Sequence, residues 1–399
     1  MFDKTDPARG LSLFCTIIYI VAVTIGAFTG GLWAALGIAL ALVAFFTTWL
    51  RDKKPPSPSK IFALFALIAL ALFAAELPAS SQPDLSAKFL LRLASIFLPL
   101  VLLTSKRLQA IASSSFFIPA TALAASLGAL ALGCELFSGG ALLHAFKKPQ
   151  ASLTEYNRGA AHLVILAFPL FAGLWLSGKR TSALLLAVLL LFPSSLTESR
   201  TAKLALLVGV ACSIAALYRP LWVRRLLSLV AVVLMPWPLY AQAFFSYFPA
   251  QVEKLPPSWQ HRIEIWDYLS YRICERPLFG WGLGTTHTLD VAQPHGNLYK
   301  YATEAAPHAH NFITQLWVET GVVGLALGLA FLLLTLRAAF KLHPGLRPFA
   351  LGGWAAAVTV SMFGFDFWTD ALWAAFALSA FVFGMLQQRL ESGKNLIGV

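Results

Sequence analysis

Two arginines stand where the chain passes between long apolar runs and the short polar segments that join them. Arg158 lies in E-Y-N-R-G, and Arg200 lies in S-L-T-E-S-R-T-A-K at a break between two apolar runs. A guanidinium binds phosphate oxygens through two parallel hydrogen bonds, so both residues could hold an anionic ligand at a membrane surface. The alternative is an arginine that only snorkels to the interface. Taken alone, Arg158 fits that alternative better, whereas Arg200 fits either interpretation.

A third arginine lies on a predicted amphipathic helix. In S-W-Q-H-R-I-E-I-W-D-Y-L-S-Y-R-I at 258–273, apolar residues recur three or four positions apart, and Ser258 could cap the helix. The tryptophans of this segment suit a membrane interface. Arg262, Arg272 and Arg276 all lie on it, and for the last two a solvated charged face is the better explanation.

Two histidines, His308 and His310, lie in P-H-A-H-N-F directly before an apolar run. Histidine can act as a general base near neutral pH. An H-x-H pair could also bind a metal, but the other histidines and the acidic residues show no matching spacing, so we expect no metal and no other cofactor. The glycines of 277–285 follow no strand and predict a tight turn rather than a phosphate cradle. Together the arginines and histidines suit a lipid phosphate and a hydroxyl to be activated.

The composition indicates that lipid is the solvent for most of the chain. Of its 399 residues, 58% are hydrophobic and 12% are charged, whereas a soluble domain carries roughly 25% charged residues. The formal net charge of +12 does not indicate a nucleic-acid partner, because the basic residues fall into short groups between apolar runs. The four cysteines form no metal motif, and a disulfide between Cys134 and Cys274 is left open.

We therefore predict an all-α polytopic membrane protein with about 12 transmembrane helices and one large periplasmic loop that contains the amphipathic helix. Residues 1–245 would form the first nine helices, 246–311 the periplasmic loop, and 312–399 the last three helices and a cytoplasmic tail. The predicted spans are 11–29, 32–50, 61–77, 88–104, 111–136, 159–177, 181–196, 202–218, 222–245, 312–336, 349–365 and 369–387.

The basic residues set the predicted orientation of these spans. With both termini in the cytoplasm, more than half of the 30 Lys and Arg lie inside, including the K-R pairs at 106–107 and 179–180. The acidic D-F-W-T-D at 366–370 then lies outside. The candidate arginines and histidines all come to the periplasmic side of a multi-pass protein.

Three segments resemble one known family. H-A-H-N-F-I-T-Q-L-W-V-E-T-G-V-V-G at 308–324 closely resembles a motif of the O-antigen ligase family, whose superfamily also contains the O-antigen polymerases and the bacterial protein O-oligosaccharyltransferases. R-I-E-I-W followed by P-L-F-G-W-G-L-G at 262–284 resembles the family's R-x-x-x-W and P-x-x-G-x-G segment. S-R-T-A at 199–202 resembles its S-R-[GA]-[AG]. The resemblance is specific from about 190 to 330, and elsewhere only the hydropathy agrees.

The resemblance implies a glycosyltransferase of lipopolysaccharide biosynthesis in the bacterial inner (plasma) membrane. Such enzymes take a glycan from undecaprenyl pyrophosphate on the periplasmic face, and the ligases transfer it to a sugar hydroxyl of lipid A-core without metal or nucleotide. A single displacement would invert the anomeric centre. The implied partners are the undecaprenyl-pyrophosphate-linked donor, the lipid A-core acceptor and membrane lipid. Arg200 and Arg262 would bind the pyrophosphate and stabilise it as it leaves, with Arg158 as a weaker candidate.

The resemblance also implies the roles of residues around the histidine pair. His310, which occupies the His-Asn position of the motif, would be the catalytic base that deprotonates the acceptor hydroxyl. His308 and Asn311 would support it. Asp366 could orient His310 or bind the acceptor, whereas topology and solvation explain Asp370 better.

Other functions stay open. An O-antigen polymerase uses another lipid-linked glycan as acceptor, and a protein O-oligosaccharyltransferase uses Ser or Thr. Polymerases often carry two arginine-rich outer loops, so the single long loop here favours a ligase. A transporter of lipid-linked glycans typically has repeated halves and ionisable groups near mid-membrane, whereas these halves differ and the notable charges cluster at the outer face. A structural scaffold would explain the hydropathy but not the histidines and arginines.

Overall fold

The computed structural model describes residues 7–29, 32–146, 152–197, 200–291, 299–364 and 366–394. Over these ranges the chain forms helices, turns and loops but no strand, so the predicted all-α fold is confirmed. Nine helices of the described chain are long and apolar enough to span a membrane, and a tenth span results if one bent pair of helices is counted as one.

The longer helices follow the predicted apolar runs, apart from the helix at 257–275, which follows the predicted amphipathic segment. They are α1 (Pro7–Val23) with α2 (Ile25–Phe28), α3 (Leu32–Asp52), α4 (Lys60–Glu76), α5 (Pro83–Leu102), α7 (Phe117–Phe137), α9 (Tyr156–Leu176), α10 (Arg180–Leu196), α11 (Thr201–Tyr218), α12 (Pro220–Leu234), α13 (Trp237–Tyr247), α15 (Pro257–Glu275), α16 (Phe312–Lys341), α17 (Arg347–Phe363) and α18 (Asp370–Glu391). The shorter elements are α6 (Lys106–Ala112), α8 (Ala141–Phe146), α14 (Pro249–Val252) and the 3₁₀ turns η1 (Leu77–Ala79), η2 (Leu153–Glu155) and η3 (Thr286–Thr288).

Three predicted spans need comment. Those at 181–196 and 349–365 correspond to α10 and α17, which have 17 residues each, fewer than the roughly 20 that cross a bilayer. Twelve spans therefore stay a prediction. The single helix expected over 222–245 is wrong, because α12 and α13 meet at an angle of 63°. Pro236 and Pro238 explain the break, since each removes an amide donor and its ring clashes with the preceding turn.

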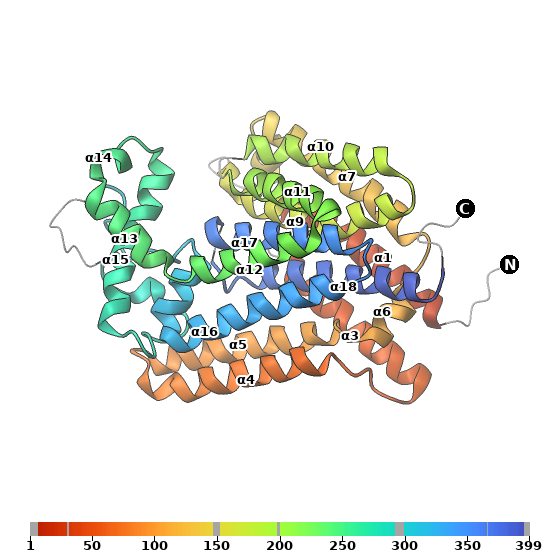
Figure 1. Cartoon of the computed structure of the whole chain (residues 1–399), viewed down its shortest axis with the longest axis horizontal. Helices are drawn as coiled ribbons and strands as arrows, with labels where there is room; N and C mark the ends of the chain where they lie inside the picture. Colours follow the sequence, from red (N-terminus) through yellow and green to blue (C-terminus); the bar gives the residue numbers. More distant parts are fainter. Residues whose placement is uncertain are drawn as a thin grey trace.

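The long helices lie side by side along the long axis of the molecule (Figure 1). At one end, α13, α14, α15 and the connection to α16 form a smaller unit, residues 237–291 and 299–311, which we call the cap. The start of α1 and the end of α18 lie at the opposite end (Figure 1). The other helices form the bundle, in which α9 contacts α7, α10, α17 and α18 and is buried along nearly its whole length. Bundle and cap each have a hydrophobic core.

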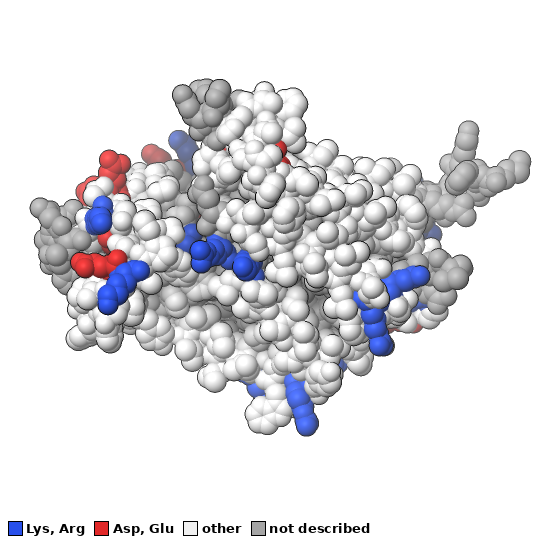
Figure 2. All heavy atoms as spheres, turned by 90° about the horizontal axis from the view of Figure 1, so that it is seen from above, with Lys and Arg blue, Asp and Glu red and all other residues white. Residues whose placement is uncertain are grey.

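Charged side chains largely avoid the flank of the bundle. In Figure 2 most of the visible bundle face carries neither acidic nor basic residues; acidic side chains show mainly at the left end, and basic ones show there, in a group left of the centre, at the lower edge and toward the right. On α4 and α12, large apolar side chains are exposed instead, among them Leu64, Leu67, Leu226 and Leu229. Such a surface suits contact with lipid, as expected for a multi-pass membrane protein.

α16 is interrupted at Gly321, which has φ 61° and ψ −157°, a combination that essentially only glycine adopts. Near the break, the carbonyl oxygens of Val318 and Glu319 accept hydrogen bonds from the amides of Trp281 (2.9 Å) and Gly282 (2.8 Å). The glycine-rich segment is therefore a turn that docks against α16. The amides of Trp281, Gly282 and Gly284 donate to α16 and are not offered to a phosphate.

Substitution of Gly321 should destabilise this docking. A Cβ on Gly321 would lie 2.1 Å from the carbonyl oxygen of Leu278, so we expect Gly321→Ala to cost roughly 2–4 kcal/mol. Gly178→Ala is the matched control, because Gly178 also has a positive φ of 75° but has nothing within 4 Å of its Cβ position. The melting temperatures in detergent measure the difference. Equal losses in both variants would mean that the close approach is unimportant.

Candidate active site

The junction of cap and bundle gathers basic side chains from three parts of the chain. Arg158 lies in the first turn of α9, Arg262 in the second turn of α15, and His308 and His310 in the connection that enters α16. The ring centroids of the two histidines are 4.1 Å apart, and that of His261 is 6.4 Å from His310. The charge of Arg262 acts on both His308 and His310, and that of Arg158 acts on His308. Four predicted site residues therefore meet here, together with His261.

His310 has a left-handed backbone with φ 52°, which His, Asn and Asp tolerate better than most residues do. Its Nδ1 lies 3.0 Å from the carbonyl oxygen of Gly364, just after α17. A carbonyl oxygen can only accept a hydrogen bond, so Nδ1 carries the hydrogen and donates it. Nε2 is then the unprotonated nitrogen, and it can accept a proton from a substrate.

Burial keeps both histidines neutral. Burial, assisted by His308, Arg262 and His261, lowers the pKa of His310 to about 3. Burial, assisted by the charges of Arg158 and Arg262, lowers the pKa of His308 to about 4. An anion bound beside these arginines would oppose the positive charges and make His310 more basic.

These pKa values predict a protein that acid destabilises. An unfolded histidine has a pKa of about 6.5, so below that pH the unfolded chain binds protons that folded His308 and His310 do not. The contribution to stability is complete above about pH 6.5 and is lost as the pH falls toward about 4. We expect the melting temperature to fall between about pH 7 and pH 5, and to fall less when both residues are Asn. His343→Asn, which replaces an exposed histidine, should keep the wild-type dependence; an unchanged dependence in the double variant would contradict the assignment.

Asn311 fixes the start of α16. Its side chain is fully buried, and its oxygen accepts hydrogen bonds from the backbone amides of Ile313 (3.0 Å) and Thr314 (2.9 Å). This is the N-cap arrangement, which satisfies amides that the helix itself leaves without partners. The Asn311 amide donates to the carbonyl oxygen of Met362 in α17 at 3.2 Å. Asn311 therefore joins α16 to α17 immediately beside His310.

Two side chains of α15 hold the connection that carries the histidines. The Glu264 carboxylate accepts hydrogen bonds from the three backbone amides of 300–302, at 3.1, 2.8 and 2.8 Å. Trp266 donates from its indole nitrogen to the carbonyl oxygen of Ala309 at 2.8 Å. The same helix thus carries Arg262 and the anchors of the histidine-bearing segment.

Two details of α15 differ from the predictions. Pro256 occupies the N-cap position and Ser258 does not, because Pro257, which has no amide hydrogen, suits the first helical position. Trp266 is only 2% exposed and belongs to the core of the cap rather than to a membrane-facing surface.

Removing the Glu264 carboxylate should release the three amides. Hydrogen bonds to a charged group contribute about 1.5–3 kcal/mol each, so we expect Glu264→Ala to speed hydrogen exchange at 300–302 by at least about tenfold. Glu275→Ala is the control, because its carboxylate, on the same helix, pairs with the Arg272 side chain at 2.9 Å. Hydrogen exchange of this segment, measured by mass spectrometry in both variants, tests the prediction. Unchanged rates in Glu264→Ala would show that other contacts hold the segment.

Arg200 lies close to the C-terminal end of α17, next to Gly364, which His310 contacts. It directly precedes α11 and is exposed. The next residue, Thr201, donates from its hydroxyl to the carbonyl oxygen of Phe363 at 2.8 Å. Among the described residues, however, no hydrogen bond or ion pair links Arg200 to the histidine pair.

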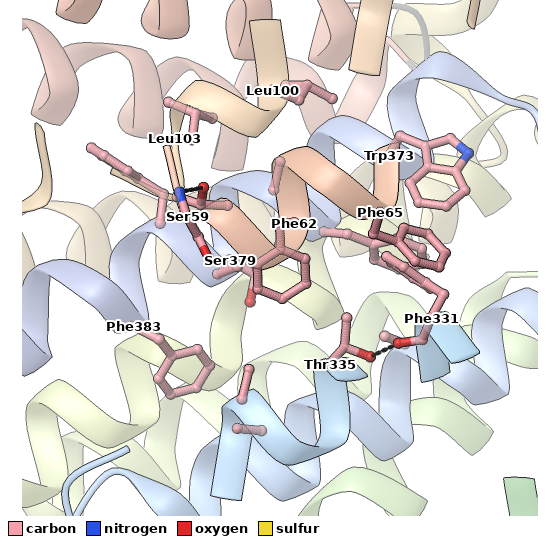
Figure 3. A pocket seen from close by; sticks show the side chains of 18 of the residues that line it. Ser59, Phe62, Phe65, Leu100, Leu103, Phe331, Thr335, Trp373, Ser379 and Phe383 are labelled. Carbon is pink, nitrogen blue, oxygen red and sulfur yellow. Dashed lines mark hydrogen bonds between the residues drawn. The ribbon is translucent and has the colours of Figure 1, made fainter. Parts of the chain in front are cut away.

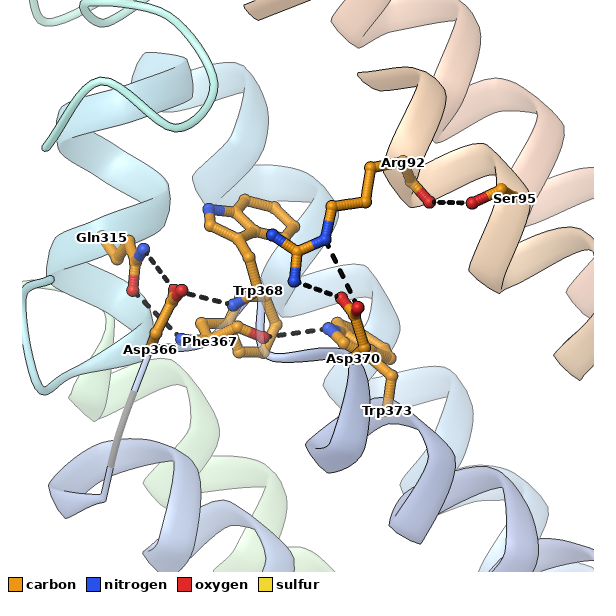
Figure 4. A network of polar contacts seen from close by, with 8 residues as sticks. All are labelled: Arg92, Ser95, Gln315, Asp366, Phe367, Trp368, Asp370 and Trp373. Carbon is orange, nitrogen blue, oxygen red and sulfur yellow. Dashed lines mark hydrogen bonds and ion pairs between the residues drawn. The ribbon is translucent and has the colours of Figure 1, made fainter. Parts of the chain in front are cut away.

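Asp366 contacts Gln315 and Trp368 and not His310, which it was predicted to orient (Figure 4). Binding of the acceptor by Asp366 stays a prediction. The Asp366 carboxylate accepts hydrogen bonds from the Gln315 amide at 2.7 Å and from the backbone amide of Trp368 at 3.0 Å. The group that orients His310 is instead the carbonyl of Gly364. Asp366 therefore positions the connection between α17 and α18.

Sequence reasoning missed His261 and several buried carboxylates, of which Glu264 and Glu319 hold the segments around the site. Besides Glu264, Glu319 is buried in α16 and accepts hydrogen bonds from the amide of Gly284 (2.8 Å), the hydroxyl of Thr286 (2.5 Å) and the indole of Trp368 (2.7 Å). It joins the glycine-rich turn, α16 and the α17–α18 connection. An acidic residue inside an apolar run is costly and was the available signal for Glu319.

Two further points concern ligands and cysteines. No three His, Cys, Asp or Glu side chains within the described ranges are grouped so that they could hold a metal ion. All four cysteines are free thiols, including Cys134 and Cys274, whose pairing the sequence left open.

Comparison with known proteins shows what part of the chain is similar to. Residues 182–329, from α10 into α16, match the family model described as O-Antigen ligase. A protein of Rickettsia felis named "Putative polysaccharide ligase" is 29% identical over 207 residues, which cover 48% of this chain and 48% of that protein. A protein of Rickettsia bellii with the same name is 30% identical over 207 residues, covering 51% of this chain and 50% of the relative. Residues 182–329 are thus similar to the O-antigen ligase family, which confirms the resemblance over this part of the chain, and the chain spans about half the length of the curated relatives it matches.

Proposed function

We propose that this chain is an O-antigen ligase of the bacterial inner membrane. It would transfer a glycan from undecaprenyl pyrophosphate to a sugar hydroxyl of lipid A-core, without a metal and with inversion. The observation that carries the proposal is the hydrogen bond from Nδ1 of His310 to Gly364, which leaves Nε2 as a proton acceptor. The O-antigen ligase domain supports the choice of reaction.

Arg262 is the best candidate for binding the donor pyrophosphate. It makes no ion pair with any described residue, and it lies over the ring of Trp259 at 5.8 Å. Burial lowers its pKa, but an arginine still keeps its charge at neutral pH. A partly buried guanidinium without a carboxylate favours an anionic ligand, which would compensate that charge. In the proposal, Arg158 and Arg200 approach the same pyrophosphate from the bundle.

In the proposed reaction the oxygen of the acceptor hydroxyl forms a bond to the anomeric carbon while Nε2 of His310 accepts the hydroxyl proton. The bond from the anomeric carbon to the pyrophosphate oxygen breaks on the opposite side, so the configuration inverts. Undecaprenyl pyrophosphate leaves with the bonding electron pair, and the arginines stabilise the added negative charge. His310 then releases its proton to solvent.

The electrostatics of the site favour donor binding before proton transfer. With a pKa of about 3, neutral His310 is a weak base. A pyrophosphate beside Arg262 places negative charge near the imidazole and stabilises its protonated form. The donor would therefore make His310 an effective base only when a glycan is ready for transfer.

We also propose that the cap faces the periplasm and both termini face the cytoplasm. The K-R pairs at 106–107 and 179–180 follow α5 and α9, which both run away from the cap. This distribution agrees with the excess of positive charge in cytoplasmic connections.

The first test is His310→Asn, expressed in a strain that lacks the native gene. Asparagine tolerates the left-handed backbone but has no basic nitrogen, so we expect normal membrane levels and a rate lower by about 10²–10⁴-fold. Lipopolysaccharide gels should lose the long-chain ladder, and glycan should accumulate on the lipid carrier. His287→Asn, which replaces an exposed histidine elsewhere in the cap, should keep the ladder.

Other outcomes have defined meanings. A full ladder from normally expressed His310→Asn would remove His310 from the mechanism. Single repeat units on the carrier, with one unit still attached to lipid A-core, would identify a polymerase. Loss of glycan from proteins, with the ladder intact, would identify a protein O-oligosaccharyltransferase.

A further inference from the structure

A cavity of about 780 Å³ lies between α4, α5, α16, α17 and α18. In Figure 3, Phe62 and Phe65 of α4, Leu100 of α5, Phe331 of α16 and Phe383 of α18 surround it. Its lining is mainly aliphatic and aromatic, and it extends along the helices from the cap side of the bundle toward the opposite end. Its shape and lining suit the hydrocarbon chains of a lipid.

At the cap end of the cavity the lining is aromatic. Trp368 packs edge-to-face against Phe73, with ring centroids 6.1 Å apart. No Lys or Arg of the described residues lines this end. Beside it, Arg92 of α5 forms an ion pair of 2.8 Å with Asp370 of α18, so its charge is compensated (Figure 4). An anionic head group at this end would therefore have no uncompensated lysine or arginine to pair with among the described lining residues.

The opposite end is polar and basic. Ser59, Lys106, Arg107 and Gln387 line the cavity there. Arg107 forms an ion pair with Asp52 at 2.7 Å, whereas Lys106 makes no ion pair with any residue that the structure describes. An apolar cavity thus ends in one uncompensated positive charge.

We propose that this cavity binds an anionic phospholipid, with its acyl chains between the helices and its phosphate at Lys106. Basic pockets between transmembrane helices on the cytoplasmic side bind anionic head groups, and the chains would supply dispersion contacts to the apolar walls. The lipid joins the α4–α5 hairpin to α16 and α18. The inference stands apart from the glycan-transfer reaction, because it uses none of the residues assigned to that reaction.

The polyprenyl chain of the donor is a different occupant. Its pyrophosphate would have to lie near Arg262, at the cap, whereas the cation of this cavity lies at the opposite end of the bundle. The position of the phosphate therefore distinguishes the proposed phospholipid from the donor lipid.

The test uses the full chain, purified in detergent and stripped of lipid. Phosphatidylglycerol is titrated in mixed micelles while the melting temperature and the bound lipid, by native mass spectrometry, are followed. Phosphatidylcholine, inorganic phosphate and undecaprenyl phosphate are the comparison ligands. We expect phosphatidylglycerol to bind and to raise the melting temperature, and to bind about fivefold more weakly to Lys106→Gln. Lys54→Gln, an exposed lysine outside the cavity lining, should bind as the wild type does.

A second variant tests the hydrocarbon part of the site. Ala380 lines the cavity, and the bulky indole of Ala380→Trp should obstruct part of it and weaken the binding of phosphatidylglycerol. Binding of phosphatidylglycerol to a folded Ala380→Trp protein with unchanged affinity would overturn the proposal. Four further outcomes would each overturn the proposal without needing Ala380→Trp to fold. They are equal binding of phosphatidylcholine, full stabilisation by inorganic phosphate alone, displacement by undecaprenyl phosphate, and unchanged binding of phosphatidylglycerol to Lys106→Gln.

Discussion

The first backbone amides of α16 lie where the apolar bundle meets the cap, and no helical carbonyl is available to them. Asn311 accepts two of these hydrogen bonds and donates to Met362, with its side chain fully buried. Because this residue must turn inward, the chain directly before it makes a left-handed bend. That bend directs the His310 ring toward Gly364. The direction of the base thus follows from the need to satisfy a helix end in an apolar surrounding.

Two buried glutamates of the cap region, Glu264 and Glu319, extend this principle. Glu264 satisfies three amides of the segment before the histidines, and Glu319 satisfies groups of the turn that docks on the broken part of α16. Neither carboxylate faces the substrate in the proposed reaction. Each replaces water for backbone groups that the irregular segments leave without helical partners. The cap can therefore be irregular and still hold its side chains in fixed places.

Hydropathy predicted the helical class. The shared site of Arg262 and His310 was predicted from two separate segments, 262–284 and 308–324, that resemble one family. Hydropathy did not predict the bend at Pro236 and Pro238, since the apolar run continues through both prolines. Hydropathy also does not tell whether the Asp366 carboxylate or the Gly364 carbonyl accepts the hydrogen bond from His310. That choice depends on where the two oxygens lie in three dimensions. Contacts between distant segments, such as those of Glu264, have no periodic pattern to reveal them.

The left-handed backbone at His310 favours a different residue from the one that the proposed reaction needs. At φ 52° glycine would be the least strained residue, and a buried imidazole that must stay neutral adds a further cost. A lineage released from selection for activity would thus drift toward glycine or asparagine at this position. A histidine retained here across relatives would therefore indicate continued use in the reaction, beyond its hydrogen bond to the Gly364 carbonyl.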